Sequence, residues 1–205
     1  GIEVDAVEKG SYQVLEHTIT AKEAIVATNS PNLNLIPAHI DLVAIEIELV
    51  DKTHREMMLR KALDPIKDDY DYIFIDCAPS LGLITLNALT AAHSVIIPIQ
   101  CEYFALEGLG KLLNTIKSIQ KIHNAGLGIE GMLLTMYDSR LRLSNQVVDE
   151  VKKHFGNMVF STIIQRNVKL GEAPSFGETI IDYDATSKGA SSYLKLAQEL
   201  INKKK

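Results

Sequence analysis

The stretch YDYIFIDCAPSLGLITLNALTAAHSVIIPIQ, residues 70–100, joins two apolar runs through a segment of helical character. The runs Tyr72–Ile75 and Ser94–Ile99 are rich in Ile, Val and Phe and lack polar alternation, as is typical of strands covered on both faces. We expect Leu83–Ala92, which lies between them, to form a buried helix. The succession predicts part of a parallel sheet, because a right-handed crossover returns its helix over the sheet.

The same alternation continues on both sides of this stretch. Further strand-like runs are Leu33–Pro37, Gly131–Met136 and Val159–Ile164, and further amphipathic helical segments are Glu56–Ile66, Leu106–His123 and Leu143–Phe155. This order predicts an α/β fold with a mostly parallel, twisted sheet and helices on both faces. At 205 residues the chain can bury one substantial core, and we expect a single domain over residues 1–205.

The overall charge limits the kind of partner that the chain can bind. Its formal net charge is -5, so any binding to nucleic acid has to come from a local basic patch. The two cysteines, Cys77 and Cys101, are too few for a disulfide framework and have no zinc-site spacing, which favours a reducing cytoplasm. The first residues carry no signal peptide.

A possible membrane span has to be weighed, because no Asp, Glu, Lys or Arg occurs between Asp76 and Glu102. Such a stretch is long enough to cross a bilayer. Asn87, His93 and Pro98 interrupt its apolar character. A buried helix followed by a buried strand therefore fits this stretch better than a membrane span.

The best candidate for chemistry is Asp76, where an apolar strand ends and a turn containing Pro, Ser and Gly begins. A carboxylate at the carboxyl end of a parallel strand faces the ligand crevice of such sheets. In nucleotide-binding sheets this carboxylate holds magnesium, usually through water, because the hard cation prefers oxygen ligands. The alternative is structural: Asp76 caps the helix that starts near Leu83, or it fixes the turn.

Longer strings carry a resemblance to a known family. IDCAPSLGLITLNAL, followed by SVIIPIQCEYFALEGL, resembles the ParA/Soj family of deviant Walker ATPases, which partition chromosomes or plasmids. GMLLTMYDSR at residues 131–140 and RNVKLGEAPSFG at residues 166–177 resemble further motifs of that family, and the resemblance runs from about residue 1 to residue 198. It implies a P-loop NTPase-like fold, with ATP and Mg²⁺ as cofactors.

For the nucleotide, the resemblance implies that Asp76 is the Walker B aspartate, which binds Mg²⁺ through water, and that Pro79 and Ser80 shape the adjoining loop. It places Met136, Gln165 and Asn167 near the adenine. The chain departs from the family pattern at two positions, where Gln165 and Ala78 replace prolines. Those departures affect base packing and loop stiffness, and they leave the charged atoms unchanged.

For DNA, the resemblance implies that Arg140 and Lys169 contact phosphates without reading the sequence. Arg142 and Lys188 are candidates to extend this patch, although solvation explains a single surface cation equally well. The implied protein is an ATP-dependent homodimer that binds double-stranded DNA non-specifically, with a ParB-like partner that stimulates hydrolysis. It would be cytoplasmic and nucleoid-associated, and its cargo is either a chromosome or a plasmid.

The family's phosphate-binding segment does not occur in this sequence. Relatives carry K-G-G-V-G-K-T-T, whose backbone N–H groups and lysines cradle the phosphates, and then D-x-D-P-Q-G-N, which positions the attacking water. We therefore expect an N-terminally truncated domain that lacks the first strand and the phosphate loop. Because phosphoryl transfer depends on positioning and charge neutralisation, the chain as it stands is expected not to hydrolyse ATP, whereas the full-length protein is expected to be an ATPase.

Three alternatives remain open. The first is a MinD-like cell-division ATPase, bound to membranes through a C-terminal amphipathic stripe of Tyr193, Leu196, Ala197, Leu200 and Ile201. The second is an iron–sulfur relative that uses Cys77 and Cys101. The third is a non-catalytic module that binds DNA and a partner and has lost the phosphate loop. The basic tail Lys203–Lys205 is most simply a solvated end.

Overall fold

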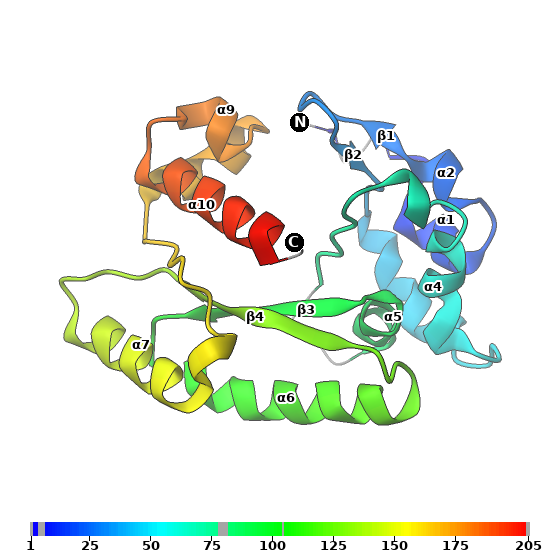
Figure 1. Ribbon diagram of the computed structural model, residues 1–205. Coiled ribbons are helices and arrows are strands. Elements are labelled where there is room, and N and C mark those ends of the chain that lie inside the picture. The colour runs from blue at the N-terminus through cyan, green and yellow to red at the C-terminus, as the bar shows by residue number, and fades with distance from the viewer. Residues whose placement is uncertain (1, 4–6, 78–81, 104, 204–205) are drawn as a thin grey trace. The chain divides into compact units, whose positions relative to one another are not determined.

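The computed structural model describes residues 2–3, 7–77, 82–103 and 105–203 (Figure 1). The chain forms two compact units. The first unit comprises Gly1–His93 and Thr115–Leu127, and the second comprises Ser94–Asn114 and Gly128–Lys205. The expectation of a single domain over residues 1–205 stays a prediction.

The second unit is built on two parallel strands, β3 (Ser94–Gln100) and β4 (Gly128–Thr135). The predicted runs Ser94–Ile99 and Gly131–Met136 are thus confirmed as neighbouring strands, with one irregularity in the register between Val95 and Ile96. Residues 131–134 of β4 are all buried, as continuous apolar runs predict.

The predicted strand Val159–Ile164 follows the other edge of β4 without forming a continuous strand. The amide of Phe160 donates to the carbonyl of Met132 at 2.9 Å, and the amide of Ile164 donates to the carbonyl of Leu134 at 2.9 Å. Parallel bridges join Met132 to Val159 and Tyr137 to Gln165. The segment therefore lies beside β4 in the parallel direction, and this contact brings residues 164–167 next to the loop that follows β4.

Helices surround these strands. The helices of the second unit are α7 (Arg142–Phe155), η5 (Gly156–Met158), α8 (Val168–Glu172), η6 (Ala173–Phe176), α9 (Ile180–Asp184) and α10 (Lys188–Lys203), and α6 (Ala105–Ile122) belongs to both units. The predicted helices Leu106–His123 and Leu143–Phe155 are confirmed to within about one residue at each end. In α7 the buried side chains are spaced as in an amphipathic helix, namely Ser144, Val147, Val148 and Val151.

Part of the C-terminal stripe belongs to the core of the second unit. Leu196 is buried in one cluster with Leu133, Phe160 and Ile164, and Leu200 packs against that cluster. Tyr193 and Ile201 are exposed. Because α10 uses Leu196 and Leu200 for packing, much of its apolar stripe is occupied within the unit.

The first unit contains short elements around two small clusters of buried side chains. These elements are α1 (Ser11–Glu16), α2 (Ala21–Ala24), β1 (Val26–Ala27), β2 (Asn34–Leu35), η2 (Ile40–Ala44), α3 (Ile45–Glu48), η3 (Arg55–Met57), α4 (Met58–Leu63), η4 (Lys67–Asp69) and α5 (Leu83–Ala91). The predicted helix Leu83–Ala92 is confirmed as α5, whereas Glu56–Ile66 divides among η3, α4 and the start of η4.

Two strand predictions in the first unit require correction. Leu33–Pro37 contributes only β2, which pairs antiparallel with β1, because the short turn between Thr28 and Leu33 reverses the chain. For Tyr72–Ile75 the structure assigns no strand, and the ring of Phe74 is 72% exposed. An apolar run specifies a strand only where a neighbouring strand offers hydrogen bonds, and among the described residues no ladder includes Ile73, Phe74 or Ile75.

A buried amide fixes α5 against its neighbours. Asn87 is fully buried, and its side chain accepts a hydrogen bond from the amide of Leu59 at 3.1 Å. It donates to the carbonyls of Arg55 at 2.8 Å and Leu83 at 3.0 Å. The stretch without charged residues is thus divided into a short buried helix and a strand, and in the described parts of the chain no helix has both the length and the apolar character needed to cross a membrane.

Candidate functional site

Asp76 lies in the first unit and its side chain is exposed to solvent. It follows the extended segment Tyr72–Ile75 and comes just before the end of the described range at Cys77. Ala78, Pro79 and Ser80 lie outside the described residues. An exposed carboxylate at this point has free oxygen atoms for a hard cation such as Mg²⁺.

The structural alternative for Asp76 as the cap of α5 is wrong, because Glu46 occupies that position. The Glu46 Oε2 atom accepts a hydrogen bond from the amide of Leu83 at 2.7 Å, and its Oε1 atom accepts one from the amide of Ile84 at 3.0 Å. A carboxylate at a helix N-terminus satisfies orphan N–H groups and interacts favourably with the helix dipole. Sequence reasoning missed Glu46, because it lies 37 residues before Leu83 and no local spacing connects them.

The three residues predicted to contact the adenine all belong to the second unit, around the carboxyl end of β4. Met136 follows β4 directly and has a φ angle of 54°, a left-handed conformation that is uncommon for a side chain of this size. Gln165 is exposed and pairs with Tyr137 through a parallel bridge, and the amide of Arg166 donates to the carbonyl of Tyr137 at 2.9 Å. These backbone contacts hold the segment that carries Gln165 beside the loop that carries Met136.

Asn167 has a structural task in addition to its predicted one. Its Oδ1 atom accepts a hydrogen bond from the amide of Lys169 at 2.9 Å and thereby caps α8. Its carboxamide nitrogen forms no hydrogen bond to the described residues and can still serve a ligand.

An open groove of about 840 Å³ runs between α10 and the segment beside β4 in the second unit. Of the predicted base contacts, only Gln165 lines it. The carboxylate of Glu199 in this groove accepts hydrogen bonds from the amides of Ser161 at 2.8 Å and Thr162 at 2.9 Å. The groove therefore brings Gln165 near α10, while Met136 and Asn167 lie outside its lining.

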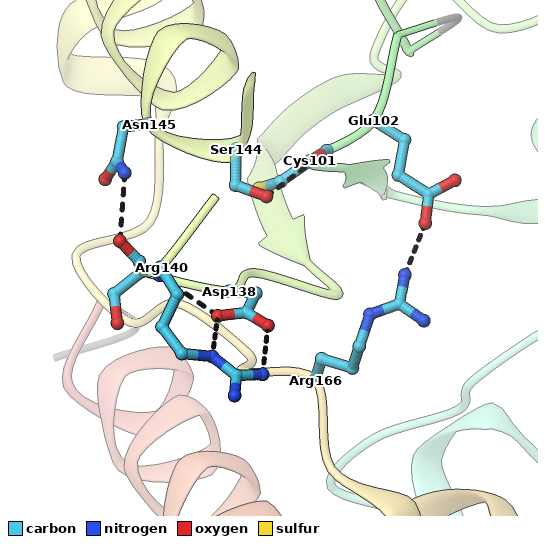
Figure 2. A network of polar contacts seen from close by, with 8 residues as sticks. Cys101, Glu102, Asp138, Arg140, Ser144, Asn145 and Arg166 are labelled. Atoms are coloured by element: carbon cyan, nitrogen blue, oxygen red, sulfur yellow. Dashed lines mark hydrogen bonds and ion pairs between the residues drawn. The ribbon is translucent and has the colours of Figure 1, made fainter. Parts of the chain in front are cut away.

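Arg140, the first predicted DNA contact, is ion-paired. Its side chain is 86% exposed, and it donates from Nε to Asp138 Oδ1 at 2.9 Å and from Nη2 to Asp138 Oδ2 at 2.6 Å (Figure 2). Hydrogen bonds from the side chain and amide of Arg140 lower the pKa of Asp138 to about 2. The guanidinium group therefore lies at the surface with its fork already bound to a carboxylate.

Lys169, the second predicted DNA contact, is also paired. Its ammonium group donates to Glu172 Oε2 at 2.9 Å and lies 5.4 Å from the centre of the Tyr183 ring. The hydrogen bond to Glu172 raises the pKa of Lys169. Arg142 and Lys188 are exposed at the first residues of α7 and α10, and neither forms an ion pair with the described residues.

Sequence reasoning also missed a salt bridge in this region. The Nη2 group of Arg166 donates to the carboxylate of Glu102, which follows β3 by two residues (Figure 2). This contact links the loop after β3 to the segment between Gln165 and Asn167. The two residues are 64 positions apart, so no motif indicates the pair.

The buried cysteine does not resemble a metal ligand. Cys101 is 1% exposed, and burial raises the pKa of its thiol to about 11. A metal or an iron–sulfur cluster requires the thiolate, which this environment disfavours. Within the described ranges, no three His, Cys, Asp or Glu side chains form a group that could hold a metal ion.

Comparisons with known proteins bear on both fold and family. A family model described as an AAA domain matches residues 1–129. The chain is 54% identical over 200 residues to the sporulation initiation inhibitor protein Soj of Bacillus subtilis (strain 168), covering 98% of this chain and 79% of Soj. It is 49% identical over 203 residues to the chromosome partitioning protein ParA of Myxococcus xanthus (strain DK1622), covering 99% of this chain and 72% of ParA.

Among solved structures, the cobyrinic acid a,c-diamide synthase of Mycobacterium smegmatis with bound ADP and magnesium superposes with a TM-score of 0.83. The two chains are 36% identical, and the match covers 98% of this chain and 74% of the synthase. The predicted α/β, P-loop NTPase-like fold with parallel strands and helices is thereby confirmed. With more than half of its residues identical to Soj over nearly its whole length, the chain belongs to the ParA/Soj family of chromosome partitioning ATPases.

Proposed function

We propose that this chain acts in an ATP-dependent DNA-partitioning protein that binds DNA without sequence preference. The observation that carries the proposal is the loop after β4, where Met136 and Arg140 stand close together in the sequence. Met136 is the proposed base contact and Arg140 the proposed phosphate contact. A change in this loop on nucleotide binding is thus a direct route to the DNA surface.

The proposed cofactors are ATP and Mg²⁺, in line with the ADP and magnesium bound to the Mycobacterium smegmatis synthase. Asp76 would hold the magnesium through water, and Met136, Gln165 and Asn167 would receive the base. Magnesium-bound ATP supplies the phosphoryl group and the charge neutralisation for its transfer. The exposed carboxylate of Asp76 and the available amide groups of Gln165 and Asn167 are chemically suited to these roles.

The proposed partners are a second copy of the chain, double-stranded DNA and a ParB-like protein that stimulates hydrolysis. Arg140 and Lys169 would contact DNA phosphates, so binding would be independent of sequence and weakened by salt. We place the protein in the cytoplasm, associated with the nucleoid. The packing of Leu196 and Leu200 in the core supports this proposal over the MinD-like alternative, because that alternative needs the stripe for a membrane.

Turnover would require a phosphate loop, since no glycine-rich phosphate-binding string occurs in the 205 residues. The test measures magnesium-dependent ATP hydrolysis, with and without DNA, by this chain and by the chain extended with the phosphate-loop segment of Bacillus subtilis Soj. We expect only the extended chain to turn over. Hydrolysis by the 205 residues alone would show that other residues hold the phosphates.

Within the extended chain, Asp76→Asn should lower turnover by roughly 10²-fold or more, the scale on which one preorganised electrostatic group contributes. Asp71→Asn is the matched control, because Asp71 is also exposed and precedes the same extended segment. Equal activity of the two variants would rule out Asp76 as the magnesium residue. DNA binding by an extended chain that never hydrolyses ATP would favour the non-catalytic module instead.

A further inference from the structure

The pairing of Arg140 with Asp138 suggests a second role for this loop. We propose that Asp138 restrains Arg140 and competes with DNA phosphate for its guanidinium group, so that it limits DNA affinity. The inference rests on the proposed function, because it requires that Arg140 contacts phosphate. It adds to that function a residue whose charge works against binding.

The geometry of the pair is that of a carboxylate occupying a phosphate site. Asp138 accepts from Nε and Nη2 of Arg140, and these two N–H groups form the fork that binds phosphate in a bidentate manner. Asp138 Oδ1 also accepts the backbone amide of Arg140 at 3.0 Å. A phosphate that binds the same fork in full therefore has to displace Asp138.

The carboxylate is the fixed member of the pair. The side chain of Asp138 is 12% exposed, against 86% for Arg140. The surrounding loop is anchored, because Tyr137 donates to Asn145 Oδ1 at 2.8 Å and Asn145 donates to the carbonyls of Ser139 at 3.1 Å and Leu141 at 2.9 Å. The guanidinium group can thus move out to solvent, while Asp138 stays in the loop and continues to attract it.

Asp138 also remains charged under ordinary conditions. Its pKa is lowered to about 2, mainly by Arg140 and to a smaller extent by the charge of Arg166. Arg166 lies near Asp138 and is itself bonded to Glu102 (Figure 2). The competition with phosphate is therefore constant across neutral pH, and relieving it requires movement or a competing anion.

The pair at Lys169 is a weaker form of the same arrangement. Lys169 forms a single contact with Glu172, whose carboxylate is 39% exposed and also accepts the hydroxyl of Tyr183 at 3.1 Å. Phosphate contacts combine multiplicatively when patches are joined in one complex. Restraining each cation thus keeps a single patch weak and makes DNA binding depend on several patches acting together.

The test uses the extended chain with ATP and magnesium, and a DNA duplex of random sequence at several salt concentrations. Asp138→Asn keeps an oxygen that can accept the Arg140 amide, so the turn is preserved. We expect it to bind DNA about two- to fivefold more tightly, the range that corresponds to a solvent-exposed ion pair. Arg140→Ala should weaken binding and reduce the salt slope by about one for each phosphate that is no longer neutralised.

The control for bulk charge is Glu150→Gln, which removes a carboxylate from α7 whose partners are Lys153 and His154. The double variant D138N/R140A should bind no better than R140A, because the gain acts through Arg140. Thermal unfolding checks that each variant folds, and Asp138→Ser replaces Asp138→Asn if the latter is unfolded.

The outcomes are distinct. Weaker binding by D138N would show that Asp138 positions Arg140 for phosphate, and an equal gain in E150Q or in the double variant would show only a bulk charge effect. Either result overturns the inference while leaving Arg140 as a DNA contact. If R140A binds as well as the unaltered chain, the DNA assignment in the proposed function is itself wrong.

Discussion

Glu46 and Leu83 form a side-chain to backbone hydrogen bond of 2.7 Å that joins α3 to the first turn of α5. The other oxygen of Glu46 bonds to the amide of Ile84. A β-carbon on Gly82 would lie 2.4 Å from Glu46 Oε1, so the absence of a side chain at Gly82 allows this close approach. The glycine and the carboxylate therefore act together at the point where the chain enters α5.

This pair yields a prediction about stability. Glu46→Ala should lower the free energy of unfolding by about 1–2 kcal/mol, because two amides at the helix start lose a charged acceptor. Gly82→Ala should have a similar effect, because the φ angle of Gly82 is -75° and suits alanine, which leaves displacement of Glu46 as the main cost. Denaturant unfolding of both single variants and of the double variant measures these values.

The double variant provides the control. With Glu46 already removed, Gly82→Ala should cost much less than it does alone, because no carboxylate remains to be displaced. Asp51→Ala, which removes an exposed carboxylate just after α3, should change stability little. Strict additivity of the Glu46 and Gly82 effects would contradict the proposed steric link.

Sequence reasoning predicted the elements whose signal is local. The helices α5, α6 and α7 follow their expected ranges, because apolar spacing within each segment determines the face that is buried. The strand expected at Tyr72–Ile75 depends on hydrogen bonds from elsewhere in the chain, and apolar character alone does not supply them.

The candidate site divides in the same way. Arg140 and Lys169 were predicted from motifs, whereas the carboxylates that hold them were not. Asp138 could have been found, because an Asp in a turn two residues before an Arg is a recognisable local pattern. The partners Glu46 with Leu83 and Glu102 with Arg166 lie far apart in the sequence, so only the folded chain shows them.

The two cysteines are predicted to differ in reactivity. Cys77 is exposed, whereas Cys101 is buried and its pKa of about 11 leaves roughly one molecule in a thousand as the reactive thiolate at pH 8. A thiol reagent should modify one cysteine quickly in the native chain and the other only after unfolding. Cys77→Ser should abolish the fast reaction, and Cys101→Ala should retain it. Two fast reactions in the native chain would show that Cys101 is accessible.

Met136 allows backbone strain to be separated from ligand contact. Its φ angle of 54° costs an L-residue about 1–2 kcal/mol, and this cost is greatest for β-branched side chains. Met136→Val should therefore lower the free energy of unfolding by about 1 kcal/mol or more. Met136→Gly should be close to neutral, because relief of strain offsets the weaker packing and the added freedom of the unfolded chain.

For nucleotide binding, the same two variants are expected to behave alike. Both remove the long side chain, so each should weaken binding of a fluorescent ATP analogue to the extended chain by roughly five- to tenfold, a fraction of the transfer free energy of a methionine side chain. Met158→Ala, at an exposed methionine of the same unit, should leave that affinity unchanged. A loss of affinity in Met136→Gly at unchanged stability would identify the side chain as a base contact, because the fold is then intact. Full affinity in that variant would remove Met136 from the nucleotide site and leave its strained backbone as a feature of the turn alone.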